Sequence, residues 1–116
     1  MLILRCFALI FLSWIFIGAG GRQDAHAACY EIIGCTSSDL YRERDLVRMS
    51  CQILGEVRNS IYAERGYCFK KPYYRQIFGH RNCRYADVGA VQLTRTERAN
   101  VSAIRSAERI RGCAGT

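Results

Sequence analysis

The arrangement of apolar and polar positions divides this chain into a short apolar leader and a longer part with helical periodicity. Apolar residues occupy nearly every position from 6 to 19, whereas beyond residue 50 they recur at intervals of three and four. The clearest recurrence predicts a helix over residues 51–65. It begins after the capping hydroxyl of Ser50 and buries Leu54, Val57, Ile61 and Tyr62.

Two further helices are predicted from the residues that begin and end them. Pro72 suits a first helical turn and Gly79 suits a helix end, so a short helix is expected over 72–78. Thr94 and Glu97 have the spacing of a capping box, so a longer helix is expected over 95–111, with Val101 leading its buried face.

The remaining segments carry weaker signals. Ser38 is expected to cap a short helical turn over Leu40 and Tyr41. No segment shows the sustained alternation of a long strand. The predicted fold class is therefore mostly α: a small disulfide-stapled domain of two longer helices and one short helix, following an N-terminal signal peptide.

The leader has the layout of a secretory signal. Arg5 precedes the apolar run, and the small residues Ala25 and Ala27 predict cleavage after Ala27. Two alternatives stay open: an uncleaved membrane anchor, and a lipoprotein carrying its lipid on Cys29. The predicted organisation is a signal peptide at 1–27, an N-terminal arm at 28–48 and a helical domain at 49–113.

The six cysteines that follow the leader predict three disulfides in an oxidising compartment. Sequence does not choose rigorously among the fifteen pairings, but the predicted helices favour three bonds. The two cysteines of the arm would close a short loop as Cys29–Cys35, and the cysteines that flank the short helix would pair as Cys68–Cys83. If the two longer helices pack antiparallel, the cysteines at their ends would pair as Cys51–Cys113 and close the longest loop. The spacing lacks the close pairs of a structural zinc site, so no metal or other cofactor is expected.

The charge balance after the leader is basic. Fifteen Lys and Arg residues face nine Asp and Glu residues, a net charge of about +6, and thirteen of the fifteen are Arg. Arg pairs readily with carboxylates and phosphates, which favours an acidic partner, although a merely solvated surface is the other interpretation. The candidate anion-binding residues, next to the aromatic pair Tyr73 and Tyr74, are Lys70, Lys71, Arg75, Arg81 and Arg84.

No catalytic constellation is visible after the leader. The one histidine, His80, lies in an Arg-rich loop without a nucleophile motif. Glu56 and Glu64 are about 80° apart around the predicted helix, which does not suit paired-carboxylate hydrolysis, and Glu64 is expected to be solvated.

The stretch 54–69 reads LGEVRNSIYAERGYCF and resembles the signature of the YARHG domain, a small bacterial extracytoplasmic module. The matching positions are Arg58, Asn59, Ile61, Tyr62, Ala63, Gly66, Tyr67 and Phe69. Glu64 and Arg65 replace the signature's Arg-His pair. The similarity covers most of residues 49–113 and reaches positions like those of cysteine-containing alphaproteobacterial members: Glu97, Asn100, Val101, Ile104 and Glu108.

The resemblance implies an envelope location but no activity. It leaves two roles open for Arg58 and Asn59: hydrogen bonding to loop carbonyls, or ligand binding. The function predicted from these features is a non-enzymatic binding or scaffolding module, exported to the periplasm or the medium. Its partner would be an anionic envelope polymer or an envelope protein. Nucleic acid is not an expected partner, and membrane contact is expected only through the signal sequence of the precursor. A cell-wall hydrolase and a small secreted effector or inhibitor are the alternatives.

Overall fold

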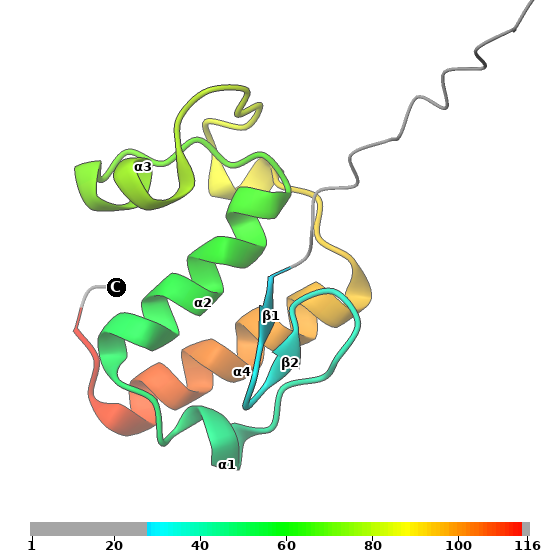
Figure 1. Ribbon diagram of the computed structural model, residues 1–116, viewed down its shortest axis with the longest axis vertical. Helices are drawn as coiled ribbons and strands as arrows, with labels where there is room; N and C mark the ends of the chain where they lie inside the picture. Colours follow the sequence, from blue (N-terminus) through cyan, green and yellow to red (C-terminus); the bar gives the residue numbers. More distant parts are fainter. Residues whose placement is uncertain (1–27, 115–116) are drawn as a thin grey trace, which may run out of the picture.

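The computed structural model describes residues 28–114 and is mostly helical, as predicted. A short hairpin of two strands with two residues each, β1 (Cys29–Tyr30) and β2 (Gly34–Cys35), precedes the helices α1 (Glu43–Leu46), α2 (Cys51–Glu64) and α3 (Pro72–Phe78). A 3-10 turn, η1 (Val88–Ala90), leads to the last helix, α4 (Arg95–Arg111) (Figure 1). The predicted leader, its cleavage site and the anchor alternative lie outside the described residues.

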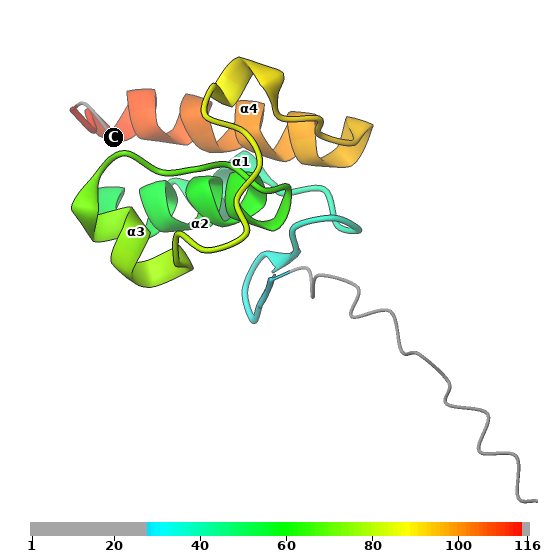
Figure 2. The same ribbon diagram turned by 90° about the horizontal axis from the view of Figure 1, so that it is seen from above.

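The core lies between α2 and α4, which run in opposite directions and form two layers when seen from above (Figure 2). The apolar stripe predicted for residues 51–65 lies on α2 and is buried against the middle of α4. The fully buried core side chains of the two helices are Leu54, Val57, Ile61, Ile104 and Ala107. Because burial of this stripe removes apolar surface from water, it is the main force holding the two helices together.

The residues predicted to begin α2 and α4 form the expected capping hydrogen bonds. The Ser50 hydroxyl accepts a hydrogen bond from the Ile53 backbone N–H, and Thr94 and Glu97 form a complete capping box. The last helix ends at Gly112, which has the left-handed φ of 70° that favours glycine.

The N-terminal segment packs into the same core through Ile33, Tyr41 and Leu46. The helical turn predicted over residues 40 and 41 is wrong: the short helix lies at Glu43–Leu46 instead. The reason is Asn100 of α4, whose side chain is 1% exposed and bonds to the backbone of residues 36, 39 and 41. These bonds hold the segment against α4, and the Ser38 hydroxyl donates to the Asp39 carboxylate rather than capping a helix.

Three disulfides link the described part of the chain in the preferred pairing. Cys29–Cys35 closes the hairpin, Cys68–Cys83 spans α3, and Cys51–Cys113 joins the start of α2 to the residue after Gly112. The last bond confirms that these two helix ends meet. Within residues 28–114, no helix has the length and apolar character that crossing a membrane requires.

Candidate functional site

A pocket of about 310 Å³ lies where α2, α3 and α4 approach one another. Five separate segments contribute to it, so it exists only in the folded domain. Its lining residues are Arg58, Asn59, Tyr62, Tyr67, Phe69, Lys70, Lys71, Tyr74, Val88 and Arg105. Half of these are positions of the 54–69 signature, which connects the signature to this pocket.

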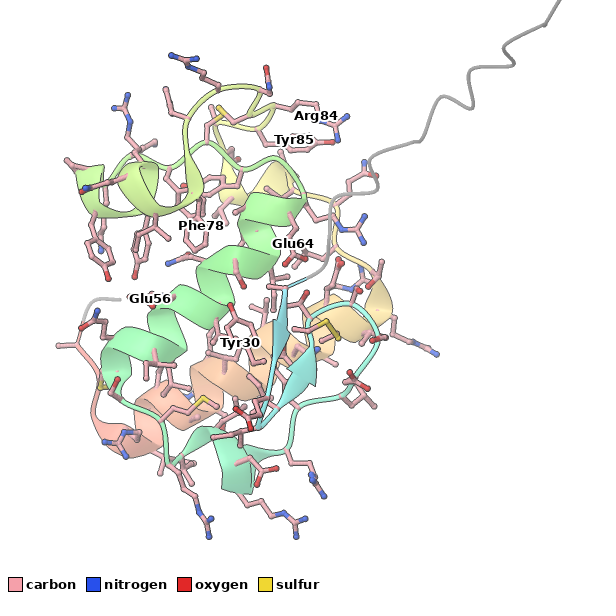
Figure 3. The ribbon with its side chains drawn as sticks, in the orientation of Figure 1. Tyr30, Glu56, Glu64, Phe78, Arg84 and Tyr85 are labelled. Carbon is pink, nitrogen blue, oxygen red and sulfur yellow. A yellow bond between two sulfur atoms is a disulfide. The ribbon has the colours of Figure 1, made fainter. Side chains whose placement is uncertain are left out.

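The floor of the pocket is aromatic. Phe69 is buried, with its ring centroid 4.8 Å from that of Tyr67 and 5.7 Å from that of Tyr74. Phe78 stacks on Phe69 at 5.2 Å and lies between α3 and α2 (Figure 3). The chain turns back after α2 at Gly66, whose φ is 90°, and the ring cluster covers the helix end.

Arg58 supplies a buried positive charge at the pocket wall. The residue is 8% exposed, and its Nη1 lies 3.5 Å from the Glu108 Oε2, which is also buried. Its Nε has no hydrogen-bond partner among the described residues. The ion pair with α4 fixes the guanidinium in place, so the partner of Arg58 is a carboxylate rather than a loop carbonyl.

Three exposed cations form the rim: Lys70 and Lys71 before α3, and Arg105 on α4. None of the ten lining residues is acidic. The positive charges therefore reinforce one another across the opening, which makes the pocket attractive to an anion.

The five predicted anion-binding residues do not form one site. All are exposed, but only Lys70 and Lys71 line the pocket, while Arg81 lines a separate cavity of about 60 Å³. Arg75 and Arg84 line neither cavity, and the Arg84 guanidinium lies 5.8 Å from the ring centroid of Tyr85 (Figure 3).

Arg105 lines the pocket but was not among the candidate anion-binding residues predicted from the sequence. A weak signal was available: Arg105 directly follows the buried Ile104, which places it at the border of the helix's buried face.

The expectation that Glu64 is solvated is wrong. Its carboxylate accepts hydrogen bonds from the Ala28 backbone nitrogen and from the Thr36 hydroxyl. Partial burial raises the pKa of Glu64 above its ordinary value, although these bonds act in the opposite direction. Glu56 lies on the α3 side of the same helix, where the Tyr73 hydroxyl donates to it and lowers its pKa (Figure 3). The two carboxylates therefore bind different segments: Glu56 binds α3, and Glu64 binds the N-terminal segment.

Arg65, the second departure from the signature, joins the end of α2 to the start of α4. Its Nε and Nη2 approach the Glu97 carboxylate at 2.6–3.0 Å, and the same carboxylate accepts from the Thr94 N–H. Glu97 is 1% exposed, so these bonds satisfy a buried charge.

A larger cavity of about 580 Å³ lies beside η1, but its lining offers fewer charged groups for binding a ligand. Among the described residues, Arg98 is its one cationic lining residue, and the Arg98 guanidinium is already bonded to the Leu93 carbonyl at 2.5 Å. No group of three or more His, Cys, Asp or Glu side chains within residues 28–114 has an arrangement that could hold a metal ion. The basic and aromatic pocket is therefore the candidate site.

These features define a small, disulfide-stabilised helical module with a basic, aromatic pocket. The family model of the YARHG domain matches residues 29–109, and the chain belongs to this family. The family comprises small extracytoplasmic domains of unknown function, and the three disulfides fit that location. The match begins within residues 28–48, the segment set apart as an arm. No match was found among curated proteins or among solved structures.

Proposed function

We propose that this protein is an exported, non-enzymatic binding module that holds an acidic sugar unit of an envelope polymer in the pocket beside α2. The observation that carries the proposal is the lining itself: among the described residues it combines four aromatic rings with three exposed cations and the ion-paired Arg58, and it contains no carboxylate. The location proposed is the periplasm or the medium, because disulfides persist in oxidising compartments.

The two kinds of lining residue suit the two parts of such a ligand. Flat aromatic faces offer apolar surface to a sugar ring, and the rim cations offer charge-assisted hydrogen bonds to its carboxylate. The volume of about 310 Å³ is at the lower end of the range for small-ligand pockets. One cyclic unit of a polymer therefore suits the site, with the chain of the polymer continuing outside.

Binding is favoured over hydrolysis by the residue types present. The lining residues within 28–114 include no carboxylate, histidine, serine or cysteine, which are the usual acids, bases and nucleophiles of hydrolases. Glu56 and Glu64 face different elements and do not converge on the pocket.

The test is co-sedimentation of the mature protein with insoluble beads that carry polygalacturonate, a polymer of acidic sugar units, at low and at high salt. The wild type is expected to sediment at low salt and to be released at high salt, without solubilising the polymer. The double variant Lys70→Glu, Arg105→Glu should reduce the sedimented fraction about tenfold, because two attractive charges of the rim become repulsive.

A matched control makes the same change in net charge elsewhere. Arg48 and Arg95 are exposed and do not line the pocket, so the double variant Arg48→Glu, Arg95→Glu should retain most of the binding. Equal losses in both double variants would show attraction by overall charge and would reject the pocket. Release of soluble fragments by the wild type would support the hydrolase alternative.

A further inference from the structure

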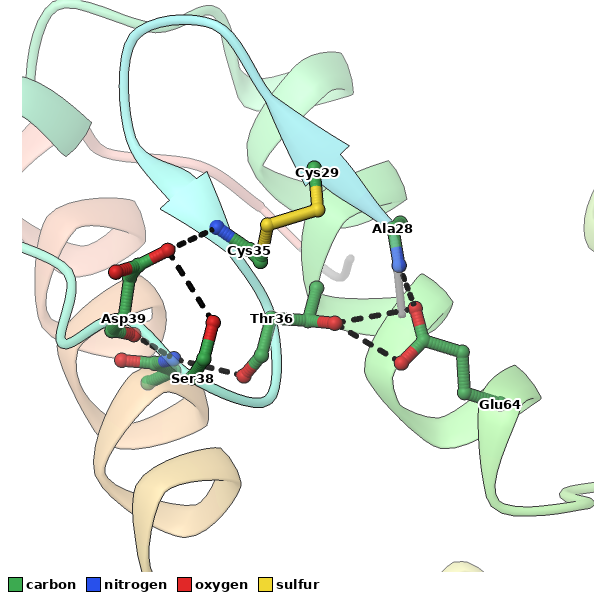
Figure 4. The surroundings of a disulfide bond; sticks show 8 residues. Ala28, Cys29, Cys35, Thr36, Ser38, Asp39 and Glu64 are labelled. Atoms are coloured by element: carbon green, nitrogen blue, oxygen red, sulfur yellow. Dashed lines mark hydrogen bonds between the residues drawn. A yellow bond between two sulfur atoms is a disulfide. The ribbon is translucent and has the colours of Figure 1, made fainter. Parts of the chain in front are cut away.

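The first described residue, Ala28, is held against the end of α2. Its backbone nitrogen donates to Glu64 Oε1 at 2.7 Å, and its carbonyl accepts from the Thr36 N–H at 2.9 Å (Figure 4). The Thr36 hydroxyl donates to the same carboxylate at 2.9 Å and 3.2 Å. Ala28 and Thr36 thus face Glu64 together.

The hairpin places Ala28 there independently of Glu64. Cys29 pairs with Cys35 in the β1–β2 register and is also bonded to it through the disulfide. The residue just before this pair therefore has little freedom, and its nitrogen is directed at the carboxylate (Figure 4).

Within residues 28–114, no cationic side chain forms an ion pair with Glu64, although its surroundings would favour one. It is the last residue of α2, where the helix dipole is negative, and the last turn of this helix contains no basic residue. The neighbouring cation, Arg65, binds Glu97 instead. The raised pKa of Glu64 shows that neutral donors do not fully offset its loss of solvation.

We propose that removal of the leader creates this partner: the α-ammonium group of Ala28 pairs with Glu64 and fixes the hairpin to the end of α2. The proposal rests on the predicted cleavage site and is independent of the pocket. Hydrolysis of the Ala27–Ala28 peptide bond by a signal peptidase consumes one water. The new carboxylate leaves on Ala27, and the new amine remains on Ala28, where it takes up a proton at neutral pH. An ammonium group offers three N–H donors in place of one.

The pairing has a defined pH window. The charged groups that act on Glu64 are Arg65 and Glu97, and the Tyr41 hydroxyl is close enough to feel its charge. A free α-amine has a pKa of about 7.7–8.0, and a carboxylate partner raises it in the folded state. The stabilisation is therefore complete where Glu64 is ionised and the pH is below about 7.7. It is lost as the pH rises through the folded-state pKa of the amine, and also as the pH falls through the pKa of Glu64, which burial raises.

The experiment is a double-mutant cycle on the full chain exported through its own leader. One change inserts Gly-Ser between Ala27 and Ala28, which moves the ammonium group away from residue 28. The other is Glu64→Gln, which removes the carboxylate charge but keeps an oxygen acceptor. Intact mass identifies the N-terminus of each product, and urea unfolding at pH 7 gives the folding equilibrium constant.

In the wild-type background the insertion should lower the folding constant about fivefold, as expected for a half-exposed charged hydrogen bond. In the Glu64→Gln background it should lower it less than about twofold. Glu56→Gln on the α3 side of the same helix is the matched control and should leave the fivefold effect unchanged. An equal effect of the insertion in all three backgrounds, or a mature N-terminus other than Ala28, overturns the proposal.

A second measurement applies if Glu64→Gln does not fold. The α-amine of the wild-type protein can be titrated by NMR after isotopic labelling of the N-terminus. A pKa above the ordinary value supports the pairing, and an ordinary pKa overturns it.

Discussion

Replacing Asn100 by alanine should be among the most damaging single changes to this domain. The side chain makes three hydrogen bonds across the core: its Nδ2 donates to the carbonyls of Thr36 and Asp39 at 3.0 Å and 2.8 Å. Its Oδ1 accepts from the Tyr41 N–H at 2.9 Å. All three bonds join α4 to the segment before α1.

The magnitude follows from the number of bonds and from burial. Each hydrogen bond contributes about 1 kcal/mol net, and buried backbone groups left without partners add a further desolvation cost, so the loss should be about 3–4 kcal/mol. A domain of this kind has a total stability of about 5–15 kcal/mol, so the variant should be close to its folding limit.

Urea unfolding of the mature protein followed by circular dichroism measures this loss. With a slope of roughly 1 kcal/mol per molar urea, the midpoint should fall by about 3 M while the slope is unchanged. Ser102→Ala, an exposed polar-to-alanine change on the same helix, should shift the midpoint by less than about 0.5 M. A shift for Asn100→Ala as small as that of the control would refute the claim that this side chain anchors the N-terminal segment.

Three further changes probe the scaffold. The paired change Cys51→Ser, Cys113→Ser should lower stability by about 4 kcal/mol, because this disulfide closes a loop with a sequence separation of 62; a loss under about 1 kcal/mol in urea unfolding would contradict this. Tyr41→Phe should leave stability unchanged or raise it by about 1 kcal/mol in thermal unfolding, because the buried hydroxyl has no partner among the described residues; a clear loss would indicate a missed bond. Arg65→Met should cost about 2 kcal/mol by leaving the buried Glu97 carboxylate without its cation, and no loss at neutral pH would show that the pair contributes nothing.

The helices and the disulfides were largely predictable because their signals are local. A hydroxyl before a helix, a glycine after it and an apolar residue every three or four positions each act within a few residues of the chain. The bonds Cys68–Cys83 and Cys51–Cys113 then followed from where the predicted helices begin and end.

The pocket was only partly predictable because its residues come together through tertiary packing. Lys70 and Lys71 directly follow the 54–69 signature and were predicted as anion-binding residues, but Arg105 reaches the rim only when α4 packs against α2. In the same way, Glu64 looked like a solvated residue, since nothing local indicates that the hairpin folds onto the end of its helix. The positions of Arg105 at the pocket and of Glu64 beneath the hairpin both depend on contacts between segments that are far apart in the sequence.

The most direct test of the proposed function is an NMR titration of the mature, isotopically labelled protein with a short galacturonate oligosaccharide. The pocket account predicts saturable shifts of the backbone amides of Asn59, Tyr67, Lys70 and Arg105, and no such shifts with an uncharged glucose oligosaccharide of equal length. Shifts that do not saturate, or that are spread over exposed arginines remote from the pocket, would contradict the claim that this site recognises an acidic sugar.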